Sequence, residues 1–262
     1  MSFLAFKSVE KTFWKDQNSS FTALNDFSLD LEEGQFFSLL GPTGCGKTTV
    51  LNLLAGFEAP TQGVIELDGA PIEGPSRDRA VVFQGDDSLY GWLTARENIE
   101  FGPRMRGTRR AERAEQSEHY LNLVGLRGQG NKHPQELSGG MKQRIQIARV
   151  LANEPKMLLM DEPFGALDAQ TRRVMQSELV KIWQATKKSV LFITHDIDEA
   201  ILLGTHVGVM NAGPAANLKT VIPIDIELGR DRTHPRFLEY YTLLRGLIEE
   251  EVNKSMLQEV EG

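Results

Sequence analysis

A nine-residue stretch near the start of the chain combines glycines, a lysine and hydroxyl groups at a spacing that suits phosphate binding. It reads G-P-T-G-C-G-K-T-T and fits the pattern G-x-x-x-x-G-K-[ST]. Its glycines would let backbone N–H groups turn inward around a polyphosphate, while Lys47 reaches the β and γ oxygens and the Thr48 hydroxyl binds Mg²⁺. The predicted phosphate loop consists of Gly41, Pro42, Thr43, Gly44, Cys45, Gly46, Lys47, Thr48 and Thr49.

Two adjacent carboxylates, Asp161 and Glu162, directly follow an apolar run at 157–160. In that position Asp161 can hold Mg²⁺ through water, and Glu162 can polarise an attacking water as a general base. The alternative is a buried strand that merely ends in an acidic turn. Because the phosphate loop stands in the same chain, the pair indicates attack of water on a bound polyphosphate.

Polar residues also follow other apolar runs. Gln84 ends the predicted strand 80–84 and His195 follows the predicted strand 190–194, and open α/β sheets place ligand chemistry at the carboxyl ends of strands. His195 is therefore expected to point toward a γ-phosphate. Ser138 is placed as the N-cap of a helix whose first residues, Gly139 and Gly140, expose backbone amides, which predicts a second anion-binding end. Taken alone, this Ser-Gly-Gly run could be only a helix start.

Two neighbouring aromatic residues, Phe13 and Trp14, offer a surface on which adenine could stack. The alternative is that these rings merely cover a sheet edge. The sequence leaves open which of the two rings would face the base.

The elements that would carry these residues alternate between strands and amphipathic helices. A buried strand at 35–40 and a helix at 48–55 flank the phosphate loop, as its motif requires. A polar loop is expected at 15–20 and a region of helices at about 86–152. The helix 171–187 should turn Val174, Met175, Leu179, Ile182 and Trp183 inward. Further strands are expected at 3–11, 21–24, 27–31, 63–69, 206–210 and 220–224, a helix at 197–203, and a terminal helix at 235–252 that packs on the core.

Composition limits the class of protein. The 262 residues are 40% hydrophobic and 25% charged, which is typical of a globular chain with a sizeable core. A net charge of -7 argues against a large basic surface for nucleic acid. The single cysteine excludes a disulfide framework within the chain. With no secretory design at the start and no apolar run of about 18 residues, we expect a cytosolic chain whose membrane role depends on a partner.

Six features follow one another along the chain: the phosphate loop, Gln84, Leu137-Ser138-Gly139-Gly140, the Asp161-Glu162 pair, Asp168 and His195. With these features in this order, the chain closely resembles the ATPase subunit of ATP-binding cassette (ABC) transporters. The resemblance implies an α/β fold, a P-loop NTPase (RecA-like) core with an antiparallel β subdomain and an inserted α-helical subdomain. It places an ATPase domain at 1–230, with the insertion at about 86–152, and a helical tail at 231–262.

The resemblance also implies roles for single residues, with ATP and Mg²⁺ as cofactors. Phe13 would stack on adenine, Gln84 would sense Mg²⁺ and the attacking water, Glu162 would be the catalytic base, and His195 would contact the γ-phosphate. In this family two subunits close head to tail on ATP, so Ser138, Gly139 and Gly140 would contact the ATP bound by the partner subunit. Asp168 would lie at that dimer contact.

Within the superfamily the chain is similar to the importer ATPases for nitrate, sulfonates such as taurine, and related solutes. The features behind this are the runs 92–98, 133–138 and 231–237. The family usually has Leu-Pro or a similar pair before Trp-Leu-Thr, where this chain has Tyr90-Gly91. The resemblance implies a peripheral protein on the cytoplasmic side of the inner membrane, bound to integral-membrane permease subunits and served indirectly by a periplasmic or extracellular solute-binding protein. Tyr90, Trp92 and Leu93 are candidates for the permease socket, although packing within the helical region would also explain them.

Two other functions compete with this interpretation. A soluble ABC ATPase of DNA repair, chromosome structure or translation would usually carry a long coiled-coil insertion or a second cassette, and neither is present. A GTPase is disfavoured because the closest match to its guanine-reading motif, Asn131-Lys132-His133-Pro134, lacks the acid. Cys45 supplies a further expectation: a helix N-terminus should lower its pKa, so that alkylation blocks ATP hydrolysis and MgATP protects.

Overall fold

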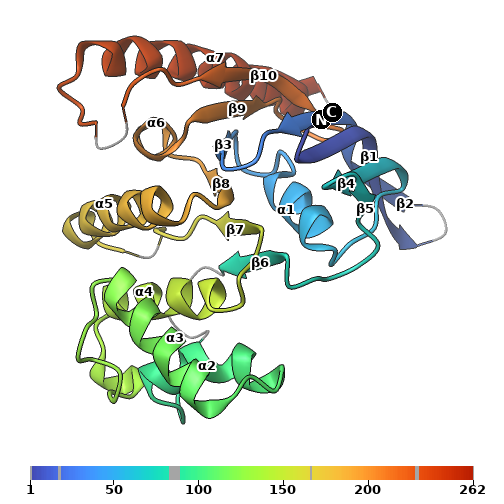
Figure 1. Ribbon diagram of the computed structural model, residues 1–262. Helices are drawn as coiled ribbons and strands as arrows, with labels where there is room; N and C mark the ends of the chain where they lie inside the picture. The colour runs from blue at the N-terminus through green and yellow to red at the C-terminus, as the bar shows by residue number, and fades with distance from the viewer. Residues whose placement is uncertain (1, 17–18, 83–88, 166, 228–229, 262) are drawn as a thin grey trace. The chain divides into compact units, whose positions relative to one another are not determined.

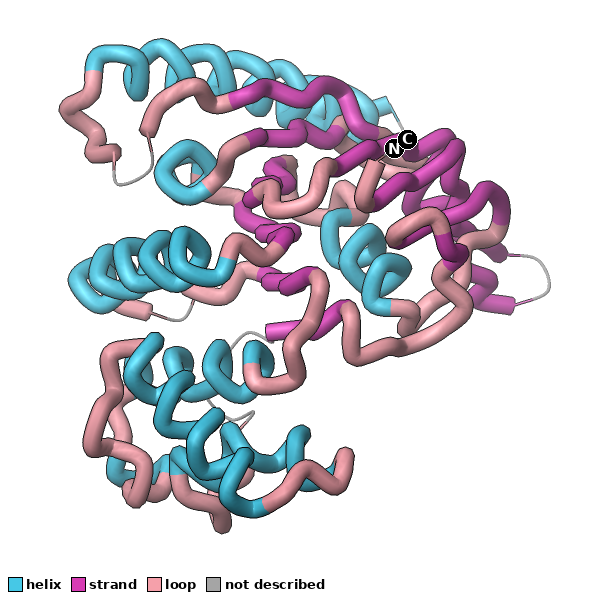
Figure 2. Tube along the Cα trace, viewed as in Figure 1, coloured by secondary structure: helices cyan, strands magenta, loops and turns pink. Residues whose placement is uncertain are grey.

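The computed structural model describes residues 2–16, 19–82, 89–165, 167–227 and 230–261 (Figure 1). They form two compact units. The first consists of Met1–Ser76 together with Lys187–Gly262, and the second of Arg77–Thr186. Most strands belong to the first unit, whereas the second is built mainly from helices (Figure 2). In the described part of the chain, no helix combines the length and apolar character needed to cross a membrane.

The first unit contains an antiparallel sheet with the strand order β2-β1-β4-β5. Leu4 of β1 lies opposite Leu31 on one side and Leu67 on the other, so the sheet turns a buried apolar face inward. Its strands are β1 (Leu4–Asp16), β2 (Ser19–Leu31), β4 (Gln62–Leu67) and β5 (Ala70–Pro71). The predicted loop at 15–20 is wrong at 15–16 and 19–20, because Trp14 pairs with Ser20 and Asp16 with Ser19, while residues 17–18 lie outside the described residues. Cross-strand hydrogen bonds extend the hairpin through residues whose local polarity predicts a loop.

A second sheet of the first unit is organised around β3 (Phe36–Leu40). β8 (Ser189–Thr194) and β9 (His206–Met210) run parallel to β3 on its two sides, and β10 (Leu218–Pro223) pairs antiparallel with β9. Every residue of β3 and β8 is buried, which explains why their sequences are apolar without alternation. The helix α1 (Lys47–Ala55) follows β3, and α6 (Ile197–Leu203) connects β8 to β9.

The C-terminal helix α7 (Pro235–Glu261) lies alongside β9 and β10 (Figure 1). Phe237 and Leu244 enter an apolar cluster with residues of α6 and β9, including Ile201 and Val207. The expectation that this helix packs on the core is therefore confirmed. Burial of its apolar side chains stabilises α7, because helix propensity alone contributes little to the stability of a helix in a protein.

The second unit combines one pair of parallel strands with helices. Its strands are β6 (Arg79–Val82) and β7 (Met157–Asp161), and its helices are α2 (Ala95–Met105), α3 (Arg110–Leu123), the 3₁₀ turn η1 (Pro134–Glu136), α4 (Gly139–Leu151) and α5 (Ala169–Thr186). The described residues between 89 and 152 contain no strand, as predicted. In α5 the inward position of Val174 is wrong, since this side chain is 52% exposed. The buried stripe begins one residue later and consists of Met175, Gln176, Leu179, Val180, Ile182 and Trp183.

Candidate functional site

The predicted phosphate loop leaves the centre of the parallel sheet in the first unit. Leu40, the last residue of β3, pairs with Thr194 of β8 and Val209 of β9, and Gly41 follows directly. Gly44 and Gly46 have φ angles of 82° and 90°, a region that favours glycine. Gly46 is also the N-cap of α1, which has no side-chain cap. The amides of the first helical turn thus face the loop, where a helix N-terminus favours an anion.

Two glycines bring the loop into close contact with its walls. A Cβ on Gly41 would lie 2.8 Å from Cys45 Sγ and 3.1 Å from Met210 Cβ, the last residue of β9. A Cβ on Gly46 would lie 3.0 Å from Leu24 Cδ2 and 3.2 Å from Ala23 O on β2. The shape of the loop therefore depends on the end of β9 and on the middle of β2.

Lys47 lies inside this loop with its side chain mostly buried. Its Nζ donates to Gly41 O at 2.7 Å and to Pro42 O at 2.8 Å. A third and longer bond goes from Nζ to Cys45 Sγ at 3.9 Å, so all three donors of the ammonium group point to loop atoms, which orients its charge. The loop thus holds a fixed positive charge at the start of a helix.

The environment of the Cys45 thiol differs from the one that the sequence predicts. It is fully buried, with Sγ under Gly41. Burial raises the pKa of the Cys45 thiol, and the nearby Lys47 charge offsets this only partly. The expected lowering of this pKa is therefore wrong, because desolvation disfavours the thiolate more than the helix N-terminus favours it.

His195 lies at the same sheet edge as the phosphate loop, because Leu40 and Thr194 pair with each other and are the last residues of the neighbouring strands β3 and β8. Its side chain is exposed, and the turn that carries it is held from both sides. Thr194 Oγ1 donates to Glu199 Oε2 at 2.7 Å and accepts from Asp196 N at 3.0 Å. The buried Glu199 was not among the predicted residues. An acid three positions after the N-cap Asp196 is the signal that could have found it.

The two candidate stacking rings have different surroundings. Lys11 Nζ lies 4.7 Å from the centroid of Phe13, and the same ammonium is bound by Glu58 Oε2 at 2.8 Å and Ala59 O at 2.9 Å. Phe13 is 36% exposed and Trp14 is 71% exposed. Lys11 also pairs across the strands with Leu24, which borders Gly46. A cation against one ring face therefore orients Phe13 near the loop.

The predicted carboxylates belong to the second unit, at the end of β7. Asp161 is the last residue of the strand, and Glu162 follows with a φ of 42°. A left-handed conformation at a glutamate is strained by about 1–3 kcal/mol, and such strain clusters at functional sites. Asp168 Oδ1 accepts from the backbone N–H groups of Gln170 at 3.0 Å and Thr171 at 3.1 Å. Hydrogen bonds from Thr171 and Gln170 keep the pKa of Asp168 below its usual value.

The Ser-Gly-Gly run starts α4 as predicted. Ser138 Oγ accepts from Met141 N at 3.3 Å, so Ser138 is the N-cap. Ser138 and Gly139 are exposed, and nothing lies within 4 Å of where a Cβ of Gly139 would stand. Gly140 instead packs against α5, where its Cβ would lie 3.2 Å from Thr171 Cγ2. The exposed helix start is thus accessible from outside the unit.

A contact that the sequence analysis missed joins α4 to the turn after β7. Gln143 is buried, and its Nε2 donates to Pro163 O at 2.6 Å, one residue after Glu162. A carbonyl can only accept, which fixes the orientation of the Gln143 amide. The signal in the sequence is a polar residue beside the apolar stripe of α4.

The remaining predicted residues divide into two cases. Gln84 lies outside the described residues. Tyr90 and Leu93 lie in a segment organised by the buried Asn98, whose side chain accepts from Tyr90 N at 2.9 Å and donates to Tyr90 O at 3.2 Å and Leu93 O at 3.1 Å. The Tyr90 ring packs on the Phe101 ring, with the two centroids 4.5 Å apart, whereas the Trp92 side chain is 74% exposed. Packing therefore accounts for Tyr90, whereas Trp92 contacts the Tyr90 ring, with centroids 5.3 Å apart, and is otherwise mostly exposed.

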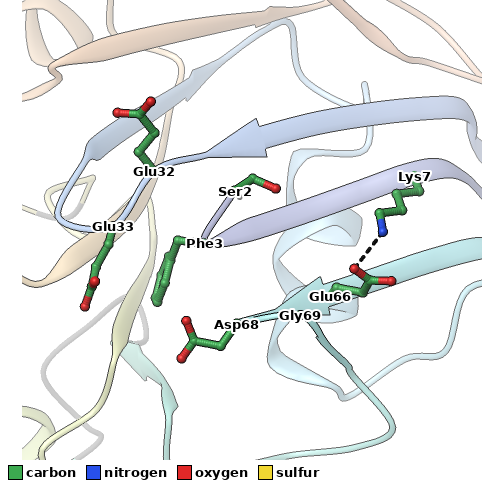
Figure 3. A pocket seen from close by; sticks show the side chains of 8 residues that line it. All are labelled: Ser2, Phe3, Lys7, Glu32, Glu33, Glu66, Asp68 and Gly69. Atoms are coloured by element: carbon green, nitrogen blue, oxygen red, sulfur yellow. Dashed lines mark hydrogen bonds and ion pairs between the residues drawn. The ribbon is translucent and has the colours of Figure 1, made fainter.

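A pocket of about 750 Å³ also opens on the first unit (Figure 3). It carries four carboxylates, and the Lys7 ammonium is bound to one of them, Glu66, at 2.6 Å. Glu32 and Glu33 precede β3, so they lie at the amino end of that strand, opposite to the phosphate loop. Its negative charge makes this pocket unsuitable for a polyphosphate.

Comparison with known proteins gives concordant results. Residues 24–165 match the sequence model of the family described as ABC transporter. The chain is 44% identical to a taurine import ATP-binding protein of Jannaschia sp. over 96% of this chain and 97% of that protein. It is 43% identical to a nitrate import ATP-binding protein of Synechocystis sp. over 90% and 92%. A dimeric ATP-binding cassette solved in a post-hydrolysis state with ADP and phosphate superposes with a TM-score of 0.69 at 30% identity, covering 86% of this chain and all of the other.

Proposed function

Because the chain belongs to the ABC transporter family, we propose that it is the ATP-hydrolysing subunit of an importer for a small solute of the nitrate, sulfonate or taurine type. ATP binding and the P-loop α/β fold follow from family membership and from the cassette structure that this chain resembles. The solute class rests on the names of relatives that match nearly the whole chain. The observation that carries the proposal is the buried Lys47, oriented by two loop carbonyls at the start of α1.

In the proposed mechanism the phosphate loop binds the β- and γ-phosphates through Lys47 and the amides of residues 43–49. Thr48, Asp161 and Gln84 would hold Mg²⁺, because hydroxyl, carboxylate and amide oxygens are the ligands that this ion accepts. When bound, Mg²⁺ neutralises charge on the phosphates. Glu162 accepts a proton from the attacking water, and His195 contacts the γ-phosphate. Phe13 stacks on adenine, with the Lys11 ammonium holding the ring from its other face.

We further propose that ATP closes two copies of the chain head to tail. The exposed residues Ser138 and Gly139 would then contact the ATP held by the partner subunit, and Gly140 would add its backbone amide from the same helix start, with its Cα packed on α5. Asp168, exposed at the start of α5, would lie at the dimer contact. The cassette that superposes on this chain was solved as a dimer, which supports this arrangement.

The membrane partner would be an integral-membrane permease, with a periplasmic or extracellular solute-binding protein acting on the permease. Trp92 is the favoured contact, because it is exposed beside a segment that Asn98 keeps rigid, and Tyr90 and Leu93 would shape the socket. The chain would then be peripheral, on the cytoplasmic side of the inner membrane, and would bind no nucleic acid.

Glu162→Gln tests the mechanism and the partner together. We expect this variant to bind MgATP as wild type does, to hydrolyse it at least about 10²-fold more slowly, and to accumulate as a closed dimer. Glu154→Gln is the control, because this residue follows α4 and has no proposed role. Normal turnover by Glu162→Gln would remove Glu162 as the base.

The same variant serves for capture of the partner from detergent-solubilised native membranes with MgATP. Recovery of a multi-span permease supports the importer. Recovery of nucleic acid, or of soluble proteins alone, would favour the soluble ABC ATPase instead. Competition between ATP and GTP for the wild-type site separates both from a GTPase.

A further inference from the structure

The connection between β9 and β10, residues 211–217, touches both walls of the phosphate loop. It begins directly after Met210, whose Cβ would lie 3.1 Å from a Cβ on Gly41. At its other end, Ala215 N donates to Thr22 O at 2.7 Å and Ala216 N donates to Ala23 O at 3.2 Å. Ala23 O in turn lies close to Gly46. Any shift of this connection would therefore displace residues that contact the phosphate loop on both of its sides.

The connection contains conformations that it would not adopt on its own. Ala215 has a φ of 55° and Gly213 has a φ of 82°. An alanine in the left-handed region is strained by about 1–3 kcal/mol and persists only where surrounding contacts hold it. Asn211 N donates to Asn217 O at 3.1 Å and closes the connection from within, and anchors from outside add to this bond.

One such anchor is Glu251 on α7, which lies beside β9 and β10 (Figure 1). This residue is only 2% exposed. Its Oε2 accepts from Ala212 N at 3.1 Å, and its Oε1 accepts from Lys219 Nζ at 2.7 Å and from Lys254 Nζ at 3.0 Å. Lys219 belongs to β10, so the carboxylate joins the start of the connection to the strand that follows it.

The electrostatics of Glu251 agree with a structural charge. Burial by itself raises the pKa of this carboxyl, but the hydrogen bonds from Lys219, Ala212 and Lys254 outweigh burial and hold the pKa at about 2. A buried carboxylate stays ionised only when donors replace its hydration. Removal of Glu251 would therefore take away the acceptor of the Ala212 N–H and leave the Lys219 ammonium with the exposed Glu250.

We propose that Glu251 is a positioning residue for nucleotide binding, which holds residues 211–217 and through them the two walls of the phosphate loop. The inference rests on the proposed function, because it assumes that this loop binds MgATP. It assigns the C-terminal helix a role in the affinity of the site. Because the loop binds substrate and transition state alike, loss of the anchor weakens binding and raises KM while kcat at saturation stays nearly constant.

The test compares three variants with wild type in the full chain. Glu251→Ala removes the acceptor, whereas Glu251→Gln keeps an oxygen for Ala212 N but loses the charge. Glu250→Gln is the matched control, since Glu250 binds the same Lys219 at 2.7 Å and the same Lys254 at 3.0 Å but is exposed and, among the described residues, makes no hydrogen bond to the connection. We measure the Kd of MgATP by calorimetry, KM and kcat for hydrolysis, and the melting temperature.

We expect Glu251→Ala to raise Kd and KM about tenfold, Glu251→Gln about threefold and Glu250→Gln by less than about twofold, with kcat within about twofold throughout. A folded Glu251→Ala variant with a lower melting temperature but wild-type Kd would overturn the proposal. If Glu251→Ala does not fold, Glu251→Gln decides: a raised Kd supports the inference and an unchanged one overturns it. Failure of wild type to bind MgATP would instead contradict the proposed function.

Discussion

The phosphate loop of the first unit and the carboxylate turn of the second are held in different ways. The backbone conformation of the loop is set by its own glycines and by the bonds from Lys47 to loop carbonyls, while β9 and β2 supply the walls against which it packs. The turn at Glu162 is strained at a non-glycine residue and is joined to α4 through the buried side chain of Gln143. A local sequence motif can therefore specify the loop, whereas the turn depends on a residue nineteen positions earlier.

The largest expected effect would come from removing the charge that the loop orients. Lys47→Met should lower MgATP affinity about 10³-fold, because truncating one partner of a buried, charge-assisted contact costs roughly 2–5 kcal/mol. Titration calorimetry measures the affinity. Lys7→Met is the control, since Lys7 is exposed and pairs only with Glu66 among the described residues. Unchanged affinity in Lys47→Met would mean that the loop does not bind the phosphates.

The free energy of unfolding of the first unit should depend on pH through Glu251. The Gln143 contact of the second unit is neutral and cannot have such a dependence. The pKa of Glu251 is lowered to about 2, so its stabilisation is complete above the unfolded pKa and is lost as pH falls from about 4.5 toward 2. At neutral pH this carboxylate contributes up to about 3 kcal/mol. Urea unfolding at pH 7 and pH 3 should show a smaller difference between the two pH values in Glu251→Gln than in wild type. Equal differences would mean that the anchor is not ionised in the native state.

The turn of the second unit should respond through turnover rather than binding. Gln143→Leu leaves the buried Pro163 O without its donor, a change that costs about 1–3 kcal/mol, and should lower kcat about tenfold with KM nearly unchanged. Steady-state hydrolysis separates the two parameters. Gln135→Leu is the control, because its bond to Gly91 O is long, at 3.4 Å, and exposed. A rise in KM with constant kcat would show that the turn acts on binding, as the loop does.

The smallest effect on hydrolysis is expected from a change at Cys45. Its raised pKa and full burial predict that a thiol reagent at pH 7 labels the folded chain at least about 10²-fold more slowly than the chain in urea. Cys45→Ala should change hydrolysis by no more than about twofold, since the side chain donates nothing to the nucleotide. Mass spectrometry of timed samples measures the labelling. Rapid labelling of the folded chain would show that the loop opens readily.

Local sequence was sufficient wherever local chemistry controls conformation. Gly44 and Gly46 could be assigned to the phosphate loop because only glycine adopts their φ angles without strain, and β3 and β8 could be identified by uninterrupted apolar runs. Ser138 could be assigned as an N-cap for the same kind of reason, since its partner, Met141 N, lies three residues away. The assigned roles of these residues in hydrolysis stay predictions.

The errors arose where contacts distant in the sequence decide the outcome. Asp16 and Ser19 look like loop residues but complete a hairpin, and Val174 looks like a core residue but lies outside the stripe that begins at Met175. Cys45 has the neighbours of a reactive thiol in sequence, yet burial under Gly41 reverses the direction of its pKa.

By itself the sequence determined the family and most of the strands and helices, and it located the phosphate-loop motif and the paired carboxylates, because each depends on residue types at short, fixed spacings. Only the tertiary structure decided which groups support them: Glu199 behind His195, Gln143 beside Glu162 and Glu251 behind the phosphate loop. The physical reason is that a buried hydrogen bond depends on proximity and desolvation. Proximity and desolvation arise only when distant segments pack together. Neither property produces a periodic pattern or a motif in the sequence.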